Sequence, residues 1–124
     1  PTLVFDEVDA GIGGAAAEIV GRRLRDLGKR HQVICITHLP QIAAFADRHY
    51  AVDKRQSGGR TRTRSLAVEG PDRLRELPRL LGDADPGEEA LRHAAEILKR
   101  ASAAPEVAPA APARRRAKAA KARG

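Results

Sequence analysis

Two short apolar runs on either side of an amphipathic stretch constrain the fold of this 124-residue chain more than any other feature. The runs are Thr2 to Phe5 and Val33 to Ile36, and each is typical of a strand that is buried on both faces. From Gly14 to Gly28, apolar residues recur at three- and four-residue spacing, which predicts a helix of about four turns. Strands joined by a helix normally lie parallel with a right-handed crossover. We therefore predict an α/β fold with a parallel sheet, in which the apolar face of the first helix is Ala16, Ile19, Val20, Leu24 and Leu27.

The segment after the second apolar run predicts smaller elements. Pro40 is suited to the first turn of a short helix within residues 39–46, and residues 49–54 have the pattern of a strand. Ser57, Gly58 and Gly59 mark a turn, and the alternation over residues 61–68 is typical of an edge strand. We expect this part of the chain to be less buried.

Two further helices are predicted. Leucines at helical spacing predict a helix over residues 72–81, and Pro78 is expected to kink or split it at a cost of roughly 3 kcal/mol. The last helix is predicted to begin at about Pro86 behind an Asp85 cap and to reach Leu98.

Polar residues follow both apolar runs at the point where each predicted strand ends. Asp6 and Glu7 follow the first run, and His38 follows the second. Ligands of open parallel sheets lie beyond the carboxyl ends of the strands, so these three side chains are predicted to share one crevice. Adjacent acids suit phosphoryl transfer, with Asp6 holding Mg²⁺ and Glu7 orienting the attacking water, while His38 contacts a terminal phosphate.

Each of these residues also has a plainer interpretation. The acidic pair is consistent with a solvated strand end, and a single histidine at such a position often caps or covers the end of a strand. Gly11, Gly13 and Gly14 lack the GxGxxG spacing and the lysine of a P-loop, so they predict a loop that approaches another surface rather than one that binds phosphate.

The formal net charge of +7 is unevenly distributed, since residues 101–124 carry +5 of it. This segment is rich in Ala, Pro, Lys and Arg, and we predict a disordered tail after a folded domain of residues 1–100. The tail is consistent with a solubilising terminus or with a salt-sensitive contact to DNA phosphates. The near absence of aromatic residues disfavours base stacking.

Other features concern the setting of the chain. There is no apolar run long enough for a membrane span, and no membrane partner is expected. Cys35 lies within an apolar run and is predicted to be a small buried hydrophobe, which fits a reducing cytoplasm. Because the chain begins at Pro1 and contains no Met, we expect a truncated product.

The stretches LVFDEVDAGIGG and VICITHLPQIAAFADRHYAVDK are distinctive enough for a family comparison. Together they resemble the C-terminal ATPase segment of the RecN family of bacterial DNA repair proteins, which are relatives of the SMC proteins among the ABC-type ATPases. The resemblance covers residues 1 to about 100 and is densest from Thr2 to Lys54. It implies the C-terminal lobe of a P-loop NTPase head.

The resemblance also implies residue roles. Asp6 matches the Walker B magnesium acid, Glu7 the catalytic glutamate and His38 the switch histidine that reads the γ-phosphate of ATP. The D-loop that crosses to a second head corresponds to residues 9–14, with Asp9, Ala10, Gly11, Gly13 and Gly14 as its contact residues. Gly13 stands where many ABC-type relatives have aspartate, so signalling between heads is expected to use backbone groups.

Three motifs of the family are missing from the 124 residues: the Walker A lysine loop, the Q-loop and the LSGG-type signature. The resemblance therefore implies an ATP- and Mg²⁺-dependent head whose activity needs the full-length protein, while this chain alone is predicted inactive. The implied function is ATP-driven head dimerisation in recombinational repair of DNA double-strand breaks, in the cytoplasm and on the nucleoid.

Two alternatives stay open at this point. One is another ATPase of the SMC, SbcC or RecF type, against which the THLPQ continuation argues. The other is a DNA-binding or assembly module without enzymatic activity that relies on the basic tail.

Overall fold

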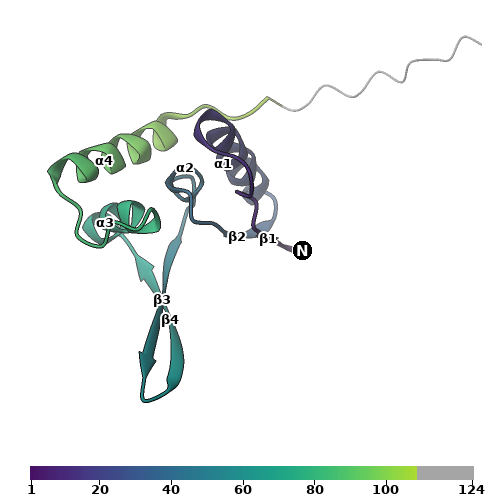
Figure 1. Ribbon diagram of the computed structural model, residues 1–124. Helices are drawn as coiled ribbons and strands as arrows, with labels where there is room; N and C mark the ends of the chain where they lie inside the picture. The colour runs from purple at the N-terminus through teal and green to yellow at the C-terminus, as the bar shows by residue number, and fades with distance from the viewer. Residues whose placement is uncertain (109–124) are drawn as a thin grey trace, which may run out of the picture.

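The computed structural model describes residues 1–108, in which two strand–helix units are followed by a strand pair and then by two helices (Figure 1). In chain order the elements are β1 (Thr2–Asp6), α1 (Gly14–Gly28), β2 (Gln32–Ile36), α2 (Pro40–Ala43), β3 (His49–Ser57), β4 (Arg60–Val68), α3 (Gly70–Leu80) and α4 (Glu88–Ala103). The prediction for a disordered tail falls largely on residues 109–124, which lie outside the described residues.

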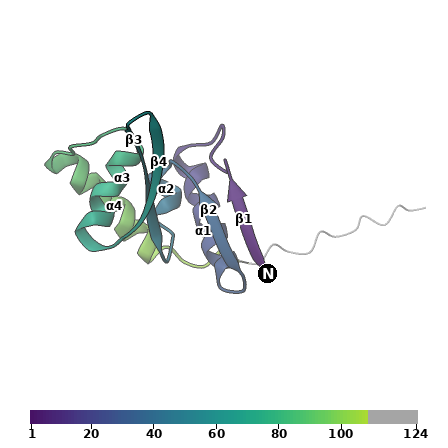
Figure 2. The ribbon, with the colours of Figure 1, turned by 90° about the horizontal axis from the view of Figure 1, so that it is seen from below.

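The strands β1 and β2 form a parallel pair, as predicted, in a register that places Asp6 opposite Ile36. Figure 2 shows this pair with α1 behind one of its faces. Val4, Ile34 and Ile36 are exposed on the opposite face, so the prediction of strands buried on both faces is wrong. The reason is that α1 covers only one face, where Cys35 is half-buried and burial raises the pKa of its thiol.

Helix α1 has the predicted bounds but a different buried face. Its buried residues are Ala17 and Gly21, whereas Ile19 of the predicted apolar face is 57% exposed. Gly21 lies against α2, and a Cβ added there would come within 2.4 Å of Cδ2 of Phe45. Small residues were needed for this close approach between two helices, and a pattern of large apolar residues does not reveal them.

The main core lies among the helices rather than on the sheet. Leu77 of α3 is 1% exposed and packs with Ala43 of α2 and Ala94 of α4. A second cluster joins Phe45 and Ala101 beside it. Within residues 1–108 none of these helices has both the length and the apolar character that crossing a membrane requires.

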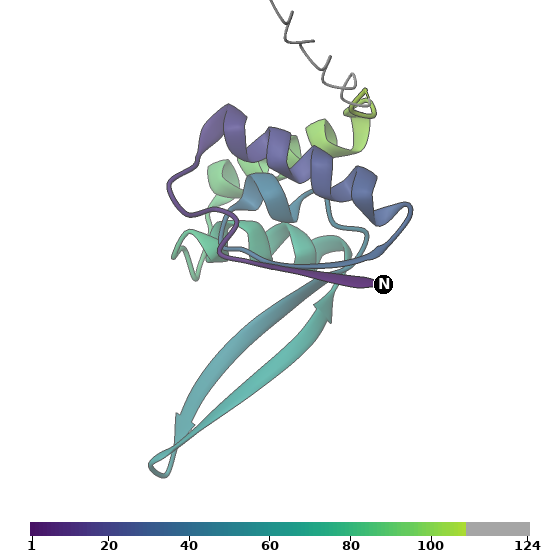
Figure 3. The ribbon, with the colours of Figure 1, turned by 90° about the vertical axis from the view of Figure 1, so that its right-hand side faces the viewer.

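The strands β3 and β4 form a separate antiparallel hairpin, not an edge of the β1–β2 sheet. Its two turn residues, Gly58 and Gly59, have φ angles of 58° and 75°, a pair of positive values that favours glycine and twists a hairpin correctly. The hairpin extends away from the helices, as Figures 1 and 3 both show. It was correctly expected to be less buried.

Two details of the last helices differ from the predictions. Pro78 does not split α3, because it lies in the last turn of the helix, where it removes only one backbone hydrogen bond. Asp85 is not a cap, because α4 begins at Glu88 and Gly87 occupies the N-cap position without a side-chain hydrogen bond.

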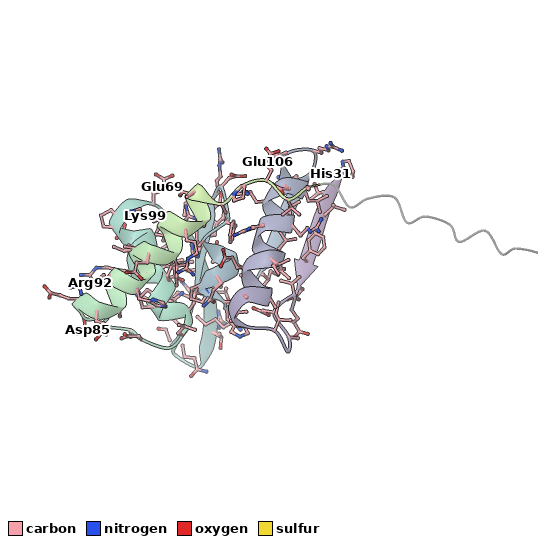
Figure 4. All side chains as sticks on the ribbon, turned by 90° about the horizontal axis from the view of Figure 1, so that it is seen from above. His31, Glu69, Asp85, Arg92, Lys99 and Glu106 are labelled. Carbon is pink, nitrogen blue, oxygen red and sulfur yellow. The ribbon has the colours of Figure 1, made fainter. Side chains whose placement is uncertain are left out.

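The chain remains ordered beyond the predicted boundary at residue 100. Helix α4 continues to Ala103, and the segment after it crosses α1, where Glu106 is labelled in Figure 4. Arg25 of α1 donates hydrogen bonds to the carbonyl oxygens of Ala101 and Pro105, and the Val107 amide donates to Asp26. The folded domain therefore includes residues up to 107.

Candidate functional site

The carboxyl ends of β1 and β2 lie at the same edge of the parallel pair. The register aligns Asp6 with Ile36, so the chain leaves β1 through Glu7 and leaves β2 through Thr37 and His38 at neighbouring positions. Asp6 and Glu7 are both exposed there. The acidic pair and the histidine therefore follow neighbouring strand ends, and a crevice shared by their side chains stays a prediction.

Glu7 has an unusual backbone conformation. Its φ angle is +54°, and among the described residues other than glycine it is the one with a positive φ. This left-handed conformation costs of order 1 kcal/mol for a residue with a Cβ. It turns the chain sharply out of β1, and the Glu7 carbonyl accepts a hydrogen bond from the Ala10 amide. The following turn is closed by the Ile12 amide, which donates to the Asp9 carbonyl.

These two turns carry the Asp9 side chain back onto the end of β2. One carboxylate oxygen, Oδ2, accepts hydrogen bonds from the Thr37 hydroxyl at 2.5 Å and from the His38 amide at 2.9 Å. The same oxygen lies 3.0 Å from Nδ1 of His38. Asp9 is 7% exposed, and its contacts therefore form a buried junction between the two strand ends.

The electrostatics of this junction favour an ionised Asp9. Burial opposes the charge, but the hydrogen bonds from the Thr37 hydroxyl and the His38 amide outweigh it and hold the pKa of Asp9 below its usual value. Nδ1 of His38 faces this carboxylate at 3.0 Å, and the rest of the side chain is open to solvent, with 70% of it exposed.

The loop between Asp9 and α1 presents its backbone to solvent. Gly11 and Gly14 have φ angles of 73° and 55°, which favour glycine. Gly13 is extended, with φ −166° and ψ 174°, a conformation open to any residue. A Cβ added at Gly13 would meet nothing within 4 Å. Neither space nor backbone geometry within this chain explains why position 13 is glycine.

The acidic side chains suit a metal ion that is held jointly by the protein and a substrate, rather than one coordinated by protein side chains alone. Among residues 1–108 no group of three or more His, Cys, Asp or Glu side chains is arranged to hold an ion. Mg²⁺ is commonly held by one or two carboxylates together with substrate phosphates and water. An exposed Asp6 at a strand end, next to Glu7, is suited to that mode of binding.

The structure joins some of the predicted site residues directly and leaves others apart. Asp9 and His38 are in contact, whereas neither Asp6 nor Glu7 makes a hydrogen bond or ion pair with His38 within the described part of the chain. Thr37 was not predicted as a site residue. The sequence feature that could have indicated Thr37 is its hydroxyl group immediately before His38. Its partner, Asp9, lies 28 residues earlier, just after the Asp6–Glu7 pair.

Comparison with solved structures identifies the class of fold. A structure determined for the structural biochemistry of ATP-driven dimerization and DNA stimulated activation of SMC ATPases matches 70% of this chain and 50% of its own, with a TM-score of 0.54 and 22% identity. The chain therefore has the fold of part of an SMC-type ATPase head, with a parallel strand pair and flanking helices. No family model matches the sequence.

Sequence relatives give the family. DNA repair protein RecN of Streptomyces coelicolor is 50% identical over 83% of this chain, and RecN of Xylella fastidiosa is 48% identical over 80%. RecN of Vibrio cholerae is 45% identical over 79% of the chain. The chain belongs to the RecN family. It spans 18% of the length of each of these relatives.

Proposed function

We propose that this chain provides the hydrolytic edge of an ATP site in a RecN-type DNA repair ATPase. Asp6 would hold Mg²⁺, Glu7 would orient and deprotonate the attacking water, and His38 would contact the γ-phosphate. The observation that carries the proposal is the hydrogen bond from the His38 amide to Asp9, with Nδ1 of His38 3.0 Å from the same carboxylate oxygen, at the end of the β1–β2 pair.

The histidine geometry supports a role in phosphate binding. Nδ1 lies 3.0 Å from the buried Asp9 carboxylate, so Nε2, on the other side of the ring, is farther from it. In the proposed complex Nε2 donates a hydrogen bond to a phosphate oxygen. Thr37 holds Asp9 in place through its hydroxyl. Mg²⁺, when bound, would neutralise part of the phosphate charge.

The strained backbone of Glu7 supports its role as the base. Consecutive side chains at a strand end project in different directions, and the left-handed φ of Glu7 takes this residue out of the regular path of β1. That separation allows one carboxylate to bind metal while the other contacts water. Strain of this kind is commonly retained at functional sites.

In the complete protein we propose that ATP joins two such heads and that hydrolysis separates them during repair of DNA double-strand breaks on the nucleoid in the cytoplasm. The names of the relatives as DNA repair proteins, and the SMC-type fold, support this assignment. The identities favour RecN over an SbcC- or RecF-type ATPase.

We further propose that Ala10, Gly11, Gly13 and Gly14 contact the second head, while Asp9 acts within its own chain. Asp9 is buried, whereas the other four residues are exposed. Gly13→Ala is a clean test because the added methyl group fits the chain without contact. Weaker ATP-dependent dimerisation is expected, and unchanged dimerisation and ATPase activity would count against this contact.

The catalytic assignment is tested by grafting residues 1–108 in place of the matching segment of the Streptomyces coelicolor relative. Glu7→Gln in the graft should lower the rate of ATP hydrolysis by about 100-fold or more while ATP binding is retained. Glu69→Gln makes the same chemical change at an exposed residue and should leave the rate unchanged. A fully active Glu7→Gln graft would refute the proposal.

The isolated chain is proposed to be inactive because its 124 residues contain no Walker A lysine loop. Titration calorimetry of the chain with ATP and Mg²⁺ should show no binding in the micromolar range. Micromolar binding would show that the chain carries a nucleotide site of its own.

The rival function is a DNA-binding module that relies on the tail. Testing it requires a truncation that preserves the fold. Ala101 is 4% exposed, and Val107 is hydrogen-bonded to Asp26, so removal from residue 101 would damage the domain. Removal of residues 109–124 avoids this. The rival would be favoured if the Glu7→Gln protein keeps full repair function and if deletion of residues 109–124 abolishes that function.

A further inference from the structure

The distal part of the β3–β4 hairpin is an exposed, purely basic ribbon. We call residues Lys54 to Ser65 the arm. Every residue of the arm is exposed, five are basic (Lys54, Arg55, Arg60, Arg62 and Arg64), and none is acidic. Because an isolated two-stranded hairpin is at best marginally stable in water, an arm without a core of its own is a feature that calls for a partner.

The strand register gathers most of this charge on one face. Arg55 lies directly opposite Arg62, Ser57 opposite Arg60, and Asp53 opposite Arg64. Side chains directly opposite each other share a face, so four arginines project from the same side of the ribbon. Like charges directly opposite each other destabilise a strand pair, and Arg55 and Arg62 form such a pair.

Most of these charges have no counterion among residues 1–108. Arg55 pairs with Asp53 at 2.9 Å, at the root of the arm. Arg60, Arg62 and Arg64 take part in no ion pair with any residue from 1 to 108. An anionic partner would therefore relieve repulsion that the fold leaves uncompensated.

The root of the hairpin is held firmly against α3. Arg79 donates to both carboxylate oxygens of Glu76 at 2.6 Å and to the Val52 carbonyl at 3.3 Å. Glu76 is buried, and its hydrogen bonds raise the pKa of Arg79. The arm therefore extends from a fixed base, for a length of about 20 Å at 3.4 Å per residue.

We propose that the arm is a binding surface for the phosphate backbone of duplex DNA. Arginine binds phosphate through a planar fork of donors, and the hydroxyl groups of Thr61, Thr63 and Ser65 on the arm add further donors. The arm contains no aromatic residue, which disfavours a single strand held by stacking. A two-stranded ribbon also fits the width of the major groove of B-DNA.

This inference deepens the proposed function, since it assigns the surface through which a DNA repair ATPase would hold DNA. It does not require ATP hydrolysis. The experiment is therefore done without nucleotide, and Glu7→Gln should leave DNA affinity unchanged. A failure of the catalytic proposal would appear in the ATPase assay, whereas a failure of the arm would appear only here.

The test measures binding of the 124-residue chain to a labelled 30-base-pair duplex of mixed sequence between 50 and 200 mM KCl. The triple variant Arg60→Gln, Arg62→Gln, Arg64→Gln should bind about tenfold or more weakly, and its log–log salt slope should fall by about 2 to 3, since each phosphate contact contributes about 0.9. The matched control Arg114→Gln, Arg115→Gln, Arg116→Gln changes the net charge equally. It should retain most of the affinity.

Two further measurements make the test decisive. The variant Arg60→Lys, Arg62→Lys, Arg64→Lys keeps the charge and should recover most of the binding, with circular dichroism confirming that all variants fold. Loss of affinity in the tail control but not in the arm variant would overturn the proposal. Equal competition by single-stranded DNA or by poly-glutamate of matched charge would also overturn it.

Discussion

The two strand pairs of this molecule carry their polar residues in opposite ways. The parallel β1–β2 pair rests against α1, and its site is organised by a buried carboxylate that reaches Thr37 and His38. The antiparallel β3–β4 pair extends into solvent, and its charges project from an exposed ribbon. The first arrangement places one side chain against a buried carboxylate, and the second presents an exposed field of charge. The comparison indicates why catalysis is expected at one pair and polyanion binding at the other.

The largest expected effect tests whether stability resides in the helical core and not in the hairpin. Leu77→Ala removes a side chain that is 1% exposed and should lower the free energy of unfolding by about 2–5 kcal/mol. Leu66→Ala, at a β4 position that is 45% exposed, should cost less than about 1 kcal/mol. Urea denaturation measures both. Equal losses would show that the hairpin is part of the cooperative core.

The next effect concerns the buried junction itself. Asp9→Asn removes charge-assisted hydrogen bonds and should cost about 1–3 kcal/mol near pH 7. Because the pKa of Asp9 in the folded state is below its ordinary value of 3.8, its stabilisation is present above that pH and is lost as pH falls through the lower, folded-state pKa.

The difference in stability between wild type and Asp9→Asn should therefore shrink as the pH is lowered from 6 to below 3.8. Urea titrations at several pH values give this difference. A gap that stays constant down to pH 2 would mean that the carboxylate charge plays no part in the junction.

A smaller effect tests the close approach of α1 to α2 behind the parallel pair. Gly21→Ala places a methyl group 2.4 Å from Cδ2 of Phe45, and the resulting strain exceeds the gain in helix propensity, for a net loss of about 1–2 kcal/mol. Gly28→Ala is the matched control in the same helix, where a Cβ meets nothing within 4 Å. Its melting temperature should be unchanged or slightly higher, and a similar loss in both variants would exclude the contact as the cause.

The smallest expected effect distinguishes stability from binding in the arm. Arg62→Thr removes the repulsion with Arg55 and introduces a residue that favours strands, so it should stabilise the fold by a few tenths of a kcal/mol. Duplex DNA affinity should fall in the same variant. If Arg62→Thr is less stable and binds DNA normally, Arg62 serves stability and not DNA binding, contrary to the role assigned to the arm.

Local patterns were sufficient to predict the first half of the fold. The alternation between apolar runs and helical spacing predicted β1, α1 and β2, because each of these elements is specified by residues that are close in the sequence. The meeting of Asp6, Glu7 and His38 at one edge followed from the rule that parallel strands end together. Their chemical roles stay predictions.

Contacts between distant residues were beyond the reach of local patterns. Asp9 was assigned to the loop that meets a second head, because its inward direction depends on two consecutive turns and a partner 28 residues away. The packing of residues 101–107 on α1 was hidden by a composition that resembles the tail after it. The exposed face of β1–β2 was missed because apolar side chains do not report how many layers cover them.

The hydrogen bond from the His38 amide to Asp9 couples the glycine loop directly to the residue that follows β2. A displacement of the loop by about 1 Å would lengthen this 2.9 Å contact beyond the range of a hydrogen bond. Docking of another protein surface against residues 10–14 would thus alter the orientation of the imidazole while the strands keep their register. If residues 10–14 meet a second head as proposed, a single carboxylate oxygen connects that contact to His38.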